Sequence, residues 1–239
     1  MNADAINAEL RSLYDLHWPA LLTSIPRSQG YSAPLLLHVK PDYAEADVRL
    51  MVVGQQTNTW WGADGWDKLR GEQDEQNRIG YLLERYSEFD LGARYPGPFW
   101  SAARSLARSL GSDNKRCALI WSNLNRVDRA QSKKDPDARA SKEIEDALRH
   151  MPLLEGEIAI LKPNVVVFFT GPNYDDRLVA TFPGVKYGPV NGQERWLSVL
   201  EHRALPRASF RTYHPGYLQR KRLLQPILDE ITKTAVGRI

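Results

Sequence analysis

The sequence predicts an α/β fold, a three-layer α/β/α sandwich around a central, mostly parallel four-stranded sheet. Two observations lead to this prediction. Four short apolar runs are rich in β-branched or aromatic residues, and patterns of helical spacing lie between them. Strands that alternate with helices form a parallel sheet with helices on both faces. We expect one domain over residues 1–239, with an N-terminal helical extension over about residues 1–40.

The four apolar runs are the expected strands, at residues 48–54, 118–124, 164–170 and 208–214. The first three runs are too short for helices and end in turn-forming polar residues, which is typical of buried strands. The fourth run alternates more between polar and apolar residues, so we expect it nearer an edge of the sheet.

Helical spacing is clearest at residues 99–110, where an apolar stripe lies opposite Arg104 and Arg108 and Gly111 ends the helix. Residues 137–161 carry two helical pieces, because Pro152 starts a second one. The other expected helices span residues 3–13 or further, 172–182 and 219–235. The segments 126–141 and 62–76 are the most loop-like, and each follows an expected strand end.

Composition excludes several classes of protein. With 42% hydrophobic and 26% charged residues, the chain is neither disordered nor collagenous. A single cysteine, Cys117, allows no internal disulfide and no iron-sulfur site. No window holds the roughly 18 uncharged apolar residues of a membrane span, and the first residues lack the basic and apolar runs of a secretion signal. We therefore expect a cytoplasmic protein.

The net charge is 32 minus 29, or +3, and the excess lies at the C-terminal end. Residues 205–239 carry seven Lys or Arg against two acids, which gives +5. A local basic excess is compatible with a polyanion partner, although solvated faces often have such charges too.

The four strand ends read GQQTNTWWG, SNLNRVD, TGPNYDD and YHPGYL, which are rich in amides and hydroxyls and include one histidine. Ligands bind beyond the carboxyl ends of strands in parallel sheets. The chain lacks a GxSxG elbow, a GxxxxGK[ST] loop and a GxGxxG turn, which argues against serine hydrolases, P-loop proteins and dinucleotide-binding enzymes. Because amides both donate and accept hydrogen bonds, the strand ends indicate a pocket for the edge of a planar heterocycle.

In this order the motifs resemble those of the uracil-DNA glycosylase superfamily. Residues 54–58, GQQTN, resemble the GQDPYH or GINPG motif, and residues 214–218, HPGYL, resemble HPSPL. The segment 161–163, LKP, precedes the third strand as in the family, and Pro98-Phe99-Trp100 is similar to the NRFW segment of its mismatch-specific branch. The resemblance covers about residues 48–222.

The resemblance implies roles for particular residues. Gln56 stands where the family keeps the Asp or Asn that positions the attacking water, and His214 where its histidine donates to the oxygen of the departing base. Asn123 or Asn125 takes the place of the asparagine that reads the base edge, and the spacing leaves both open. The other base-binding residues expected around them are Gln55, Thr57, Asn58 and Trp60. The alternative interpretation for Trp60 and Trp61 is that one is packed in the core and the other belongs to a lid, and that neither stacks on a base.

The resemblance also implies a DNA-binding surface. Leu218 stands where the family has a residue that wedges into the duplex, and Arg220, Lys221 and Arg222 follow it, where they suit phosphates. Single-stranded or mismatched DNA is the implied partner. We expect a monomer with no cofactor, no metal and no membrane partner.

The departures from the family pattern bear on catalysis. Gln56 has no carboxylate, Thr57 and Asn58 replace a Pro-Tyr or Pro-Gly pair, and Gly216 replaces a serine. The expected function is therefore a slow DNA glycosylase that removes uracil or a related deaminated or damaged base, helped if needed by an acid such as Asp64, Asp67 or Asp128. The first alternative is a module that binds a nucleobase, nucleotide or nucleic acid without cleaving it, and the second is a hydrolase of small nucleosides.

Overall fold

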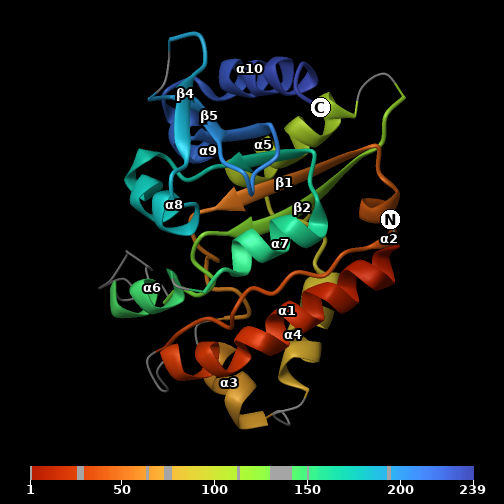
Figure 1. Ribbon diagram of the computed structural model, residues 1–239, viewed down its shortest axis with the longest axis vertical. Helices are drawn as coiled ribbons and strands as arrows, with labels where there is room; N and C mark the ends of the chain where they lie inside the picture. Colours follow the sequence, from red (N-terminus) through yellow and green to blue (C-terminus); the bar gives the residue numbers. More distant parts are fainter. Residues whose placement is uncertain are drawn as a thin grey trace.

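The structure is a computed structural model that describes residues 2–25, 30–62, 65–72, 77–111, 114–129, 142–149, 151–192 and 195–239. Six strands form one mixed sheet in the order β2-β1-β3-β6-β5-β4 (Figure 1). The strands are β1 Val48–Gly54, β2 Cys117–Asn123, β3 Val165–Phe168, β4 Lys186–Pro189, β5 Leu197–Glu201 and β6 Ala208–Thr212.

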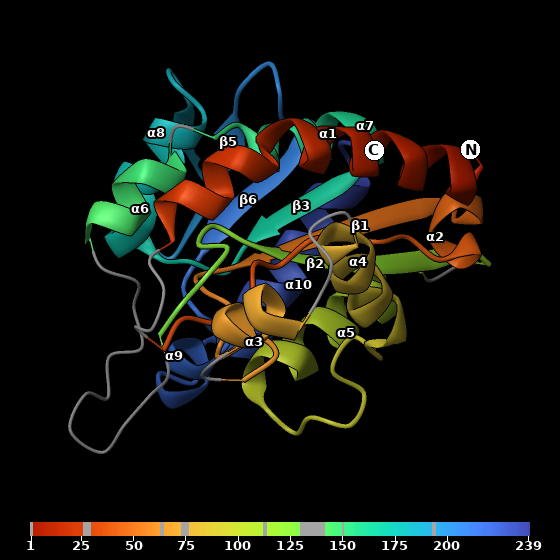
Figure 2. The same ribbon diagram turned by 90° about the horizontal axis from the view of Figure 1, so that it is seen from below.

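Helices cover both faces of this sheet, as expected. They are α1 Ala3–Ser24, α2 Pro41–Glu45, α3 Gly65–Glu72, α4 Arg78–Glu88, α5 Pro98–Leu110, α6 Lys142–Arg149, α7 Leu153–Leu161, α8 Asp175–Thr181 after the 3-10 turn η1 Pro172–Tyr174, α9 Pro215–Arg220 and α10 Leu224–Val236. One layer holds α1, α6, α7 and α8, and the opposite layer holds α5, α9 and α10 (Figure 2). None of the helices in the described ranges has the length and apolar character to cross a membrane.

The four expected strands are the parallel part of the sheet, because β1 pairs with β2 and β3, and β3 pairs with β6. The expectation of four strands is wrong, since β5 and β4 add an antiparallel pair beside β6. The expected edge position of the fourth strand is also wrong. β6 is buried throughout, and its polar Arg211 is accommodated there by Asp175, whose Oδ1 lies 3.1 Å from the guanidinium Nε.

The helices differ from the sequence patterns at residues 219–235 and at residues 62–76. Residues 219–235 form parts of two helices, because the chain turns at Arg222, whose φ is +57°. α3 occupies part of the segment 62–76 that was expected to be a loop. Most of the second expected loop, residues 130–141, lies outside the described residues.

A buried ion pair joins several of these elements. Arg126 and Glu157 are 4% and 0% exposed, and two guanidinium nitrogens donate to the two carboxylate oxygens. The Tyr14 hydroxyl of α1 donates to Glu157 Oε1 at 2.8 Å, and Ser122 of β2 donates to Oε2 at 3.3 Å. Burial and the Glu157 charge raise the pKa of Tyr14, so its hydroxyl stays a donor. The cluster thus ties α1, α7 and β2 to the segment that follows β2.

We expect Glu157→Gln to lower the free energy of unfolding by about 3–5 kcal/mol, because it leaves the buried Arg126 charge without its carboxylate. Urea unfolding followed by circular dichroism measures this change. Glu155→Gln on the same helix is the matched control, since this partly exposed side chain should change stability by about 0.5 kcal/mol or less. Equal losses in the two variants would show that the buried pair has no special role.

Candidate functional site

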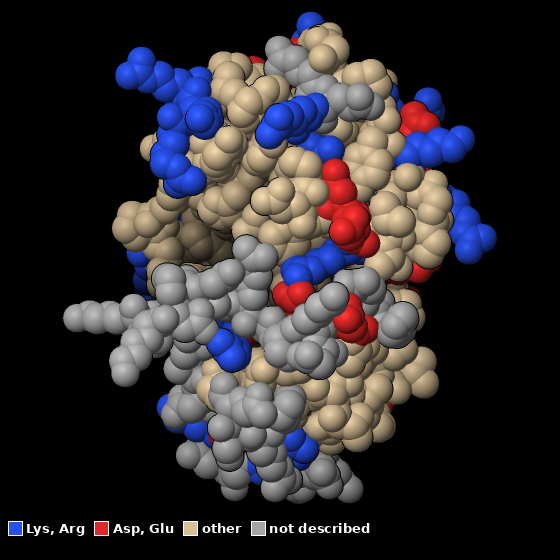
Figure 3. All heavy atoms as spheres, turned by 90° about the vertical axis from the view of Figure 1, so that its left-hand side faces the viewer, with Lys and Arg blue, Asp and Glu red and all other residues tan. Residues whose placement is uncertain are grey.

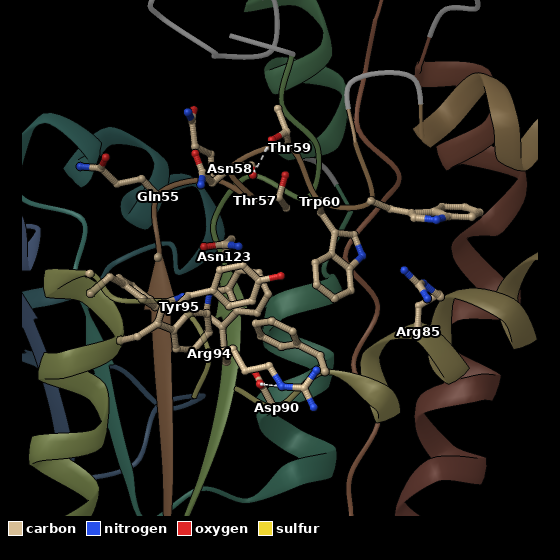
Figure 4. A pocket seen from close by; sticks show the side chains of 18 of the residues that line it. Gln55, Thr57, Asn58, Thr59, Trp60, Arg85, Asp90, Arg94, Tyr95 and Asn123 are labelled. Carbon is tan, nitrogen blue, oxygen red and sulfur yellow. Dashed lines mark hydrogen bonds and ion pairs between the residues drawn. The ribbon is translucent and has the colours of Figure 1, made fainter. Parts of the chain in front are cut away.

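A cavity of about 950 Å³ opens at the carboxyl ends of the parallel strands (Figure 4). Its lining comes from the segment after β1, the end of α4, the start of α5 with the chain before it, and the ends of β2 and β6. The lining residues are Gly54, Gln55, Gln56, Thr57, Asn58, Thr59, Trp60, Trp61, Gly62, Arg85, Glu88, Phe89, Asp90, Arg94, Tyr95, Pro96, Gly97, Pro98, Phe99, Trp100, Trp121, Asn123 and His214. The volume is typical of a small-molecule site.

Asn123 is held in the pocket wall at the end of β2. Its neighbour across the strands is Gly54, and a Cβ at Gly54 would lie 2.2 Å from the Asn123 side-chain amide and 3.3 Å from Phe99. A glycine is therefore required for the asparagine to occupy this position. With its amide oriented to satisfy the hydrogen bonds, the Asn123 nitrogen donates to the carbonyls of Gln56 and Ser122 at 3.2 and 3.1 Å, which fixes the side chain.

His214 presents a neutral donor to the pocket. Its Nδ1 accepts a hydrogen bond from the Gly216 N–H at 3.2 Å, so the neutral ring carries its proton on Nε2. Burial, and then the charge of Arg220, lower the pKa of His214 below its usual value. The ring stacks on Phe99 at a centroid distance of 5.9 Å and an interplanar angle of 23°, which sets its plane.

Two polar atoms in the pocket wall have no partner among the described residues. They are Gln56 Oε1 and Trp60 Nε1, one acceptor and one donor, and both are buried. A buried polar atom without a hydrogen bond costs about 1–3 kcal/mol. Both atoms are closed off from the pocket in this conformation, so a bound molecule would contact them only after these side chains turn toward it.

An aromatic cluster forms the floor of the pocket. Ring centroids lie 5.4 Å apart for Trp60 and Phe89, 5.3 Å for Phe89 and Trp100, and 5.2 Å for Trp100 and Trp121. The sequence interpretation missed Phe89 and Trp121 as pocket residues. For Trp121 a signal existed, because it lies in an expected strand two residues before Asn123 and so points to the same face.

The other expected base-binding residues are used differently. Gln55 Nε2 donates to the Thr170 carbonyl at 2.8 Å, which ties the ends of β1 and β3 together. Thr57 is buried, and its hydroxyl lies 3.1 Å from that of Ser32. Asn58 borders the pocket with a left-handed φ of +53°.

Asn125 and Leu218 do not fit their expected roles. The Asn125 amide donates to Glu145 of α6 at 3.1 Å and does not line the pocket, so Asn123 is the asparagine at the site. Leu218 is fully buried in the core, because α9 packs this face against the rest of the fold. A wedge that inserts into DNA must be exposed, so the expectation for Leu218 is corrected.

The basic residues that follow Leu218 are exposed. Arg220, Lys221 and Arg222 lie at and after the C-terminal end of α9, outside the pocket lining. Cations at this end of a helix are compatible with its dipole.

Carboxylates in and near the pocket are already engaged. Of the described lining residues, Glu88 lies 3.2 Å from Arg85 and Asp90 lies 3.3 Å from Arg94. Among the three acids expected to assist, Asp64 lies outside the described residues, and Asp67 of α3 does not line the pocket.

Asp128, the third of these acids, is fully buried and holds the loop after β1. Its Oδ2 accepts from the Thr59 N–H at 2.6 Å. Asn58, Thr59 and Trp61 in this loop all have positive φ values of +53° to +62°, which the backbone of residues other than glycine rarely adopts. Such a conformation persists where the surroundings impose it. Asp128 is thus a structural support of the pocket wall.

The described residues contain no group of three His, Cys, Asp or Glu side chains placed to hold a metal ion. No model of a known protein family and no curated protein matches the chain. The geometry and chemistry of the pocket are therefore the basis for assigning a function.

Burial raises the pKa of the Asp128 carboxyl, although the Thr59 N–H donates to it. This residue therefore contributes stability at low pH, and the contribution is lost as the pH rises through the raised pKa. Asp128→Asn keeps an oxygen acceptor but does not titrate. We expect the unfolding free energy of the wild type, relative to that of the variant, to fall in urea unfolding as the pH rises above about 4, the ordinary pKa of an aspartate, and through the raised pKa of Asp128. A difference that is constant with pH would contradict this assignment.

Proposed function

We propose that the pocket binds a nucleobase and that the chain is a DNA glycosylase-like hydrolase of the N-glycosidic bond of uracil or a related deaminated or damaged base. The observation that carries the proposal is that Gln56, Asn123 and His214 line one pocket with an aromatic floor. Amides and a neutral imidazole match the donors and acceptors on a base edge, and aromatic rings pack against its faces. The motifs that resemble uracil-DNA glycosylases carry these same three residues.

In this proposal, His214 stabilises the leaving base. Cleavage of the N-glycosidic bond leaves negative charge on the base, and the His214 Nε2–H donates to the oxygen on which it develops. A donor fixed before the reaction needs no reorganisation, and loss of one such donor typically costs about 10²–10³ in rate. The lowered pKa keeps the ring neutral near pH 7, so it acts as a hydrogen-bond donor without giving up its proton.

Gln56 limits the rate of such an enzyme, because an amide cannot act as a general base. Its Oε1 is buried without a hydrogen bond in the structure, and in this proposal the side chain turns toward the pocket, where Oε1 accepts a hydrogen bond from a water and orients it toward the sugar carbon. The amide does not take the proton from that water, so the proton passes to the departing base anion, and the general-base assistance that is lost is worth about 10²–10⁴ in rate. We therefore expect slow turnover that favours bases which leave easily. The cost of extruding a base also favours single strands and mismatches over matched duplex.

One observation favours the alternative of a binding module without catalysis. Both described carboxylates in the pocket lining, Glu88 and Asp90, are ion-paired with arginines, so neither is placed as an unpaired base. The pocket would then recognise a nucleobase or nucleotide and release it unchanged.

Incubation with single-stranded and mismatched oligonucleotides that carry uracil, hypoxanthine or xanthine tests the two functions. Free base and abasic sites are the products expected of the glycosylase. Saturable binding of a free base, measured by equilibrium dialysis, with no product from any oligonucleotide would support the binding module. Absence of both product and binding would contradict both functions.

We expect His214→Ala to lower the excision rate by about 10²–10³ because the leaving oxygen loses its donor, while DNA affinity changes little. Single-turnover kinetics and fluorescence anisotropy measure the two quantities. His202→Ala is the control, since His202 does not line the pocket. Parallel loss of rate and affinity in His214→Ala would indicate a structural role for this ring.

We expect Gln56→Asp to raise the excision rate about tenfold or more, because a carboxylate takes the proton that the amide does not accept. Gln56→Asn is the matched control, since it has the same length as aspartate but no basic group. A single-turnover assay on the best substrate compares the two variants. If both variants are equally slow, the attacking water does not lie at Gln56.

A further inference from the structure

A second group of aromatic rings lies beside the end of β6, outside the pocket. Tyr213 and Tyr217 stack with centroids 4.8 Å apart and an interplanar angle of 27°. Trp196 lies 5.0 Å from Tyr213 and is stacked with Tyr217 at 6.1 Å and 20°. All three side chains are partly exposed, and together they form an aromatic platform.

Exposed cations surround this aromatic platform. Arg195 Nε donates to the Tyr213 hydroxyl at 3.1 Å, and the charged groups of Arg220 and Lys221 each lie 5.8 Å from the centre of the Tyr217 ring. Between residues 201 and 229 the chain has no Asp or Glu and six Lys or Arg. Figure 3 views the molecule from the side where the carboxyl ends of the parallel strands lie. Lys and Arg side chains gather at the upper left of this view, above a hollow.

The aromatic platform and the pocket adjoin the same chain segment. Tyr213 and His214 are consecutive, but their rings contact different neighbours. His214 faces Phe99 in the pocket, whereas Tyr213 packs against Gly171, where an added Cβ would lie 3.2 Å from its ring. A strand with one base in the pocket would therefore reach the aromatic platform by crossing the end of β6.

We propose that the aromatic platform binds single-stranded DNA by stacking the bases next to the one in the pocket, while Arg195, Arg220 and Lys221 contact phosphates. This inference rests on the proposed function, because it takes DNA as the molecule that enters the pocket. Partly exposed aromatic rings among cations are the features with which proteins bind single strands without reading their sequence. In a duplex the base faces are already stacked on each other, so the rings have no partner there and the cations alone contribute.

Fluorescence anisotropy with an oligothymidine and with a matched duplex of the same length tests the proposal, since neither contains an excisable base. Tyr217→Ala should weaken single-strand binding about tenfold or more, and Tyr217→Phe, which keeps the ring, should stay within about twofold of the wild type. Duplex affinity should change much less. If Tyr217→Ala does not weaken single-strand binding, or weakens binding of both DNAs equally, the proposed role of the aromatic platform is wrong.

Arg195→Gln provides an independent test, because this exposed side chain lies away from the core. For the single strand, log affinity falls with log salt concentration, and the steepness of this fall should decrease by about 0.7, the value for one phosphate contact. An unchanged slope would contradict the phosphate role.

The two proposals can fail separately. If Tyr217→Ala weakens single-strand binding but no base is released from any substrate, the glycosylase is refuted and the aromatic platform is supported. If a base is released but Tyr217→Ala leaves single-strand binding unchanged, the aromatic platform is refuted and the glycosylase is supported.

Discussion

The buried ion pair between Arg126 and Glu157 is the interaction on which the pocket depends. Removing two such charges from water costs several kcal/mol each, and the pair persists because both carboxylate oxygens are bonded twice. The pair fixes the segment after β2. At one end of that segment Asn123 forms part of the pocket wall, and at the other Asp128 holds the strained loop that carries Gln56's neighbours. Core electrostatics thus determine where the polar groups of the site lie.

Much of the fold follows from local patterns in the sequence. The four parallel strands, the helix over residues 99–110 and the break at Pro152 are set by short-range periodicity and by proline, and the structure confirms them. The strands β4 and β5 were not predicted. The segment Lys186–Pro189 contains a glycine and a proline, which are rare in strands, whereas Leu197–Glu201 has an apolar strand pattern that the prediction missed. Lys186–Pro189 becomes a strand through its pairing with β5, which is a tertiary effect that no local pattern indicates.

The candidate site was predictable in position but not in the direction of each side chain. The rule for parallel sheets places Gln56, Asn123 and His214 at one edge, and the structure brings them together. Asn125 turns instead to Glu145, a partner twenty residues away in the chain. Leu218 belongs to a six-residue helix whose inner face is set by packing and not by its own sequence. Such orientations depend on contacts between distant segments.

Whether the pocket would cleave a nucleobase from its sugar or only bind it depends on the charged groups of the pocket, because the shape of the pocket suits both functions equally. The pocket combines buried amide and indole groups with a neutral histidine, and its carboxylates at Glu88 and Asp90 form ion pairs with arginines. In the proposed reaction, such a site would stabilise a base that leaves with negative charge, since few anionic groups oppose it. It provides little for the cation that forms on the sugar or for the proton of the water. Leaving-group stabilisation without a general base is sufficient only for bonds that are weak already, so in the proposed glycosylase the chemistry of the nucleobase, more than its shape, would set the substrates.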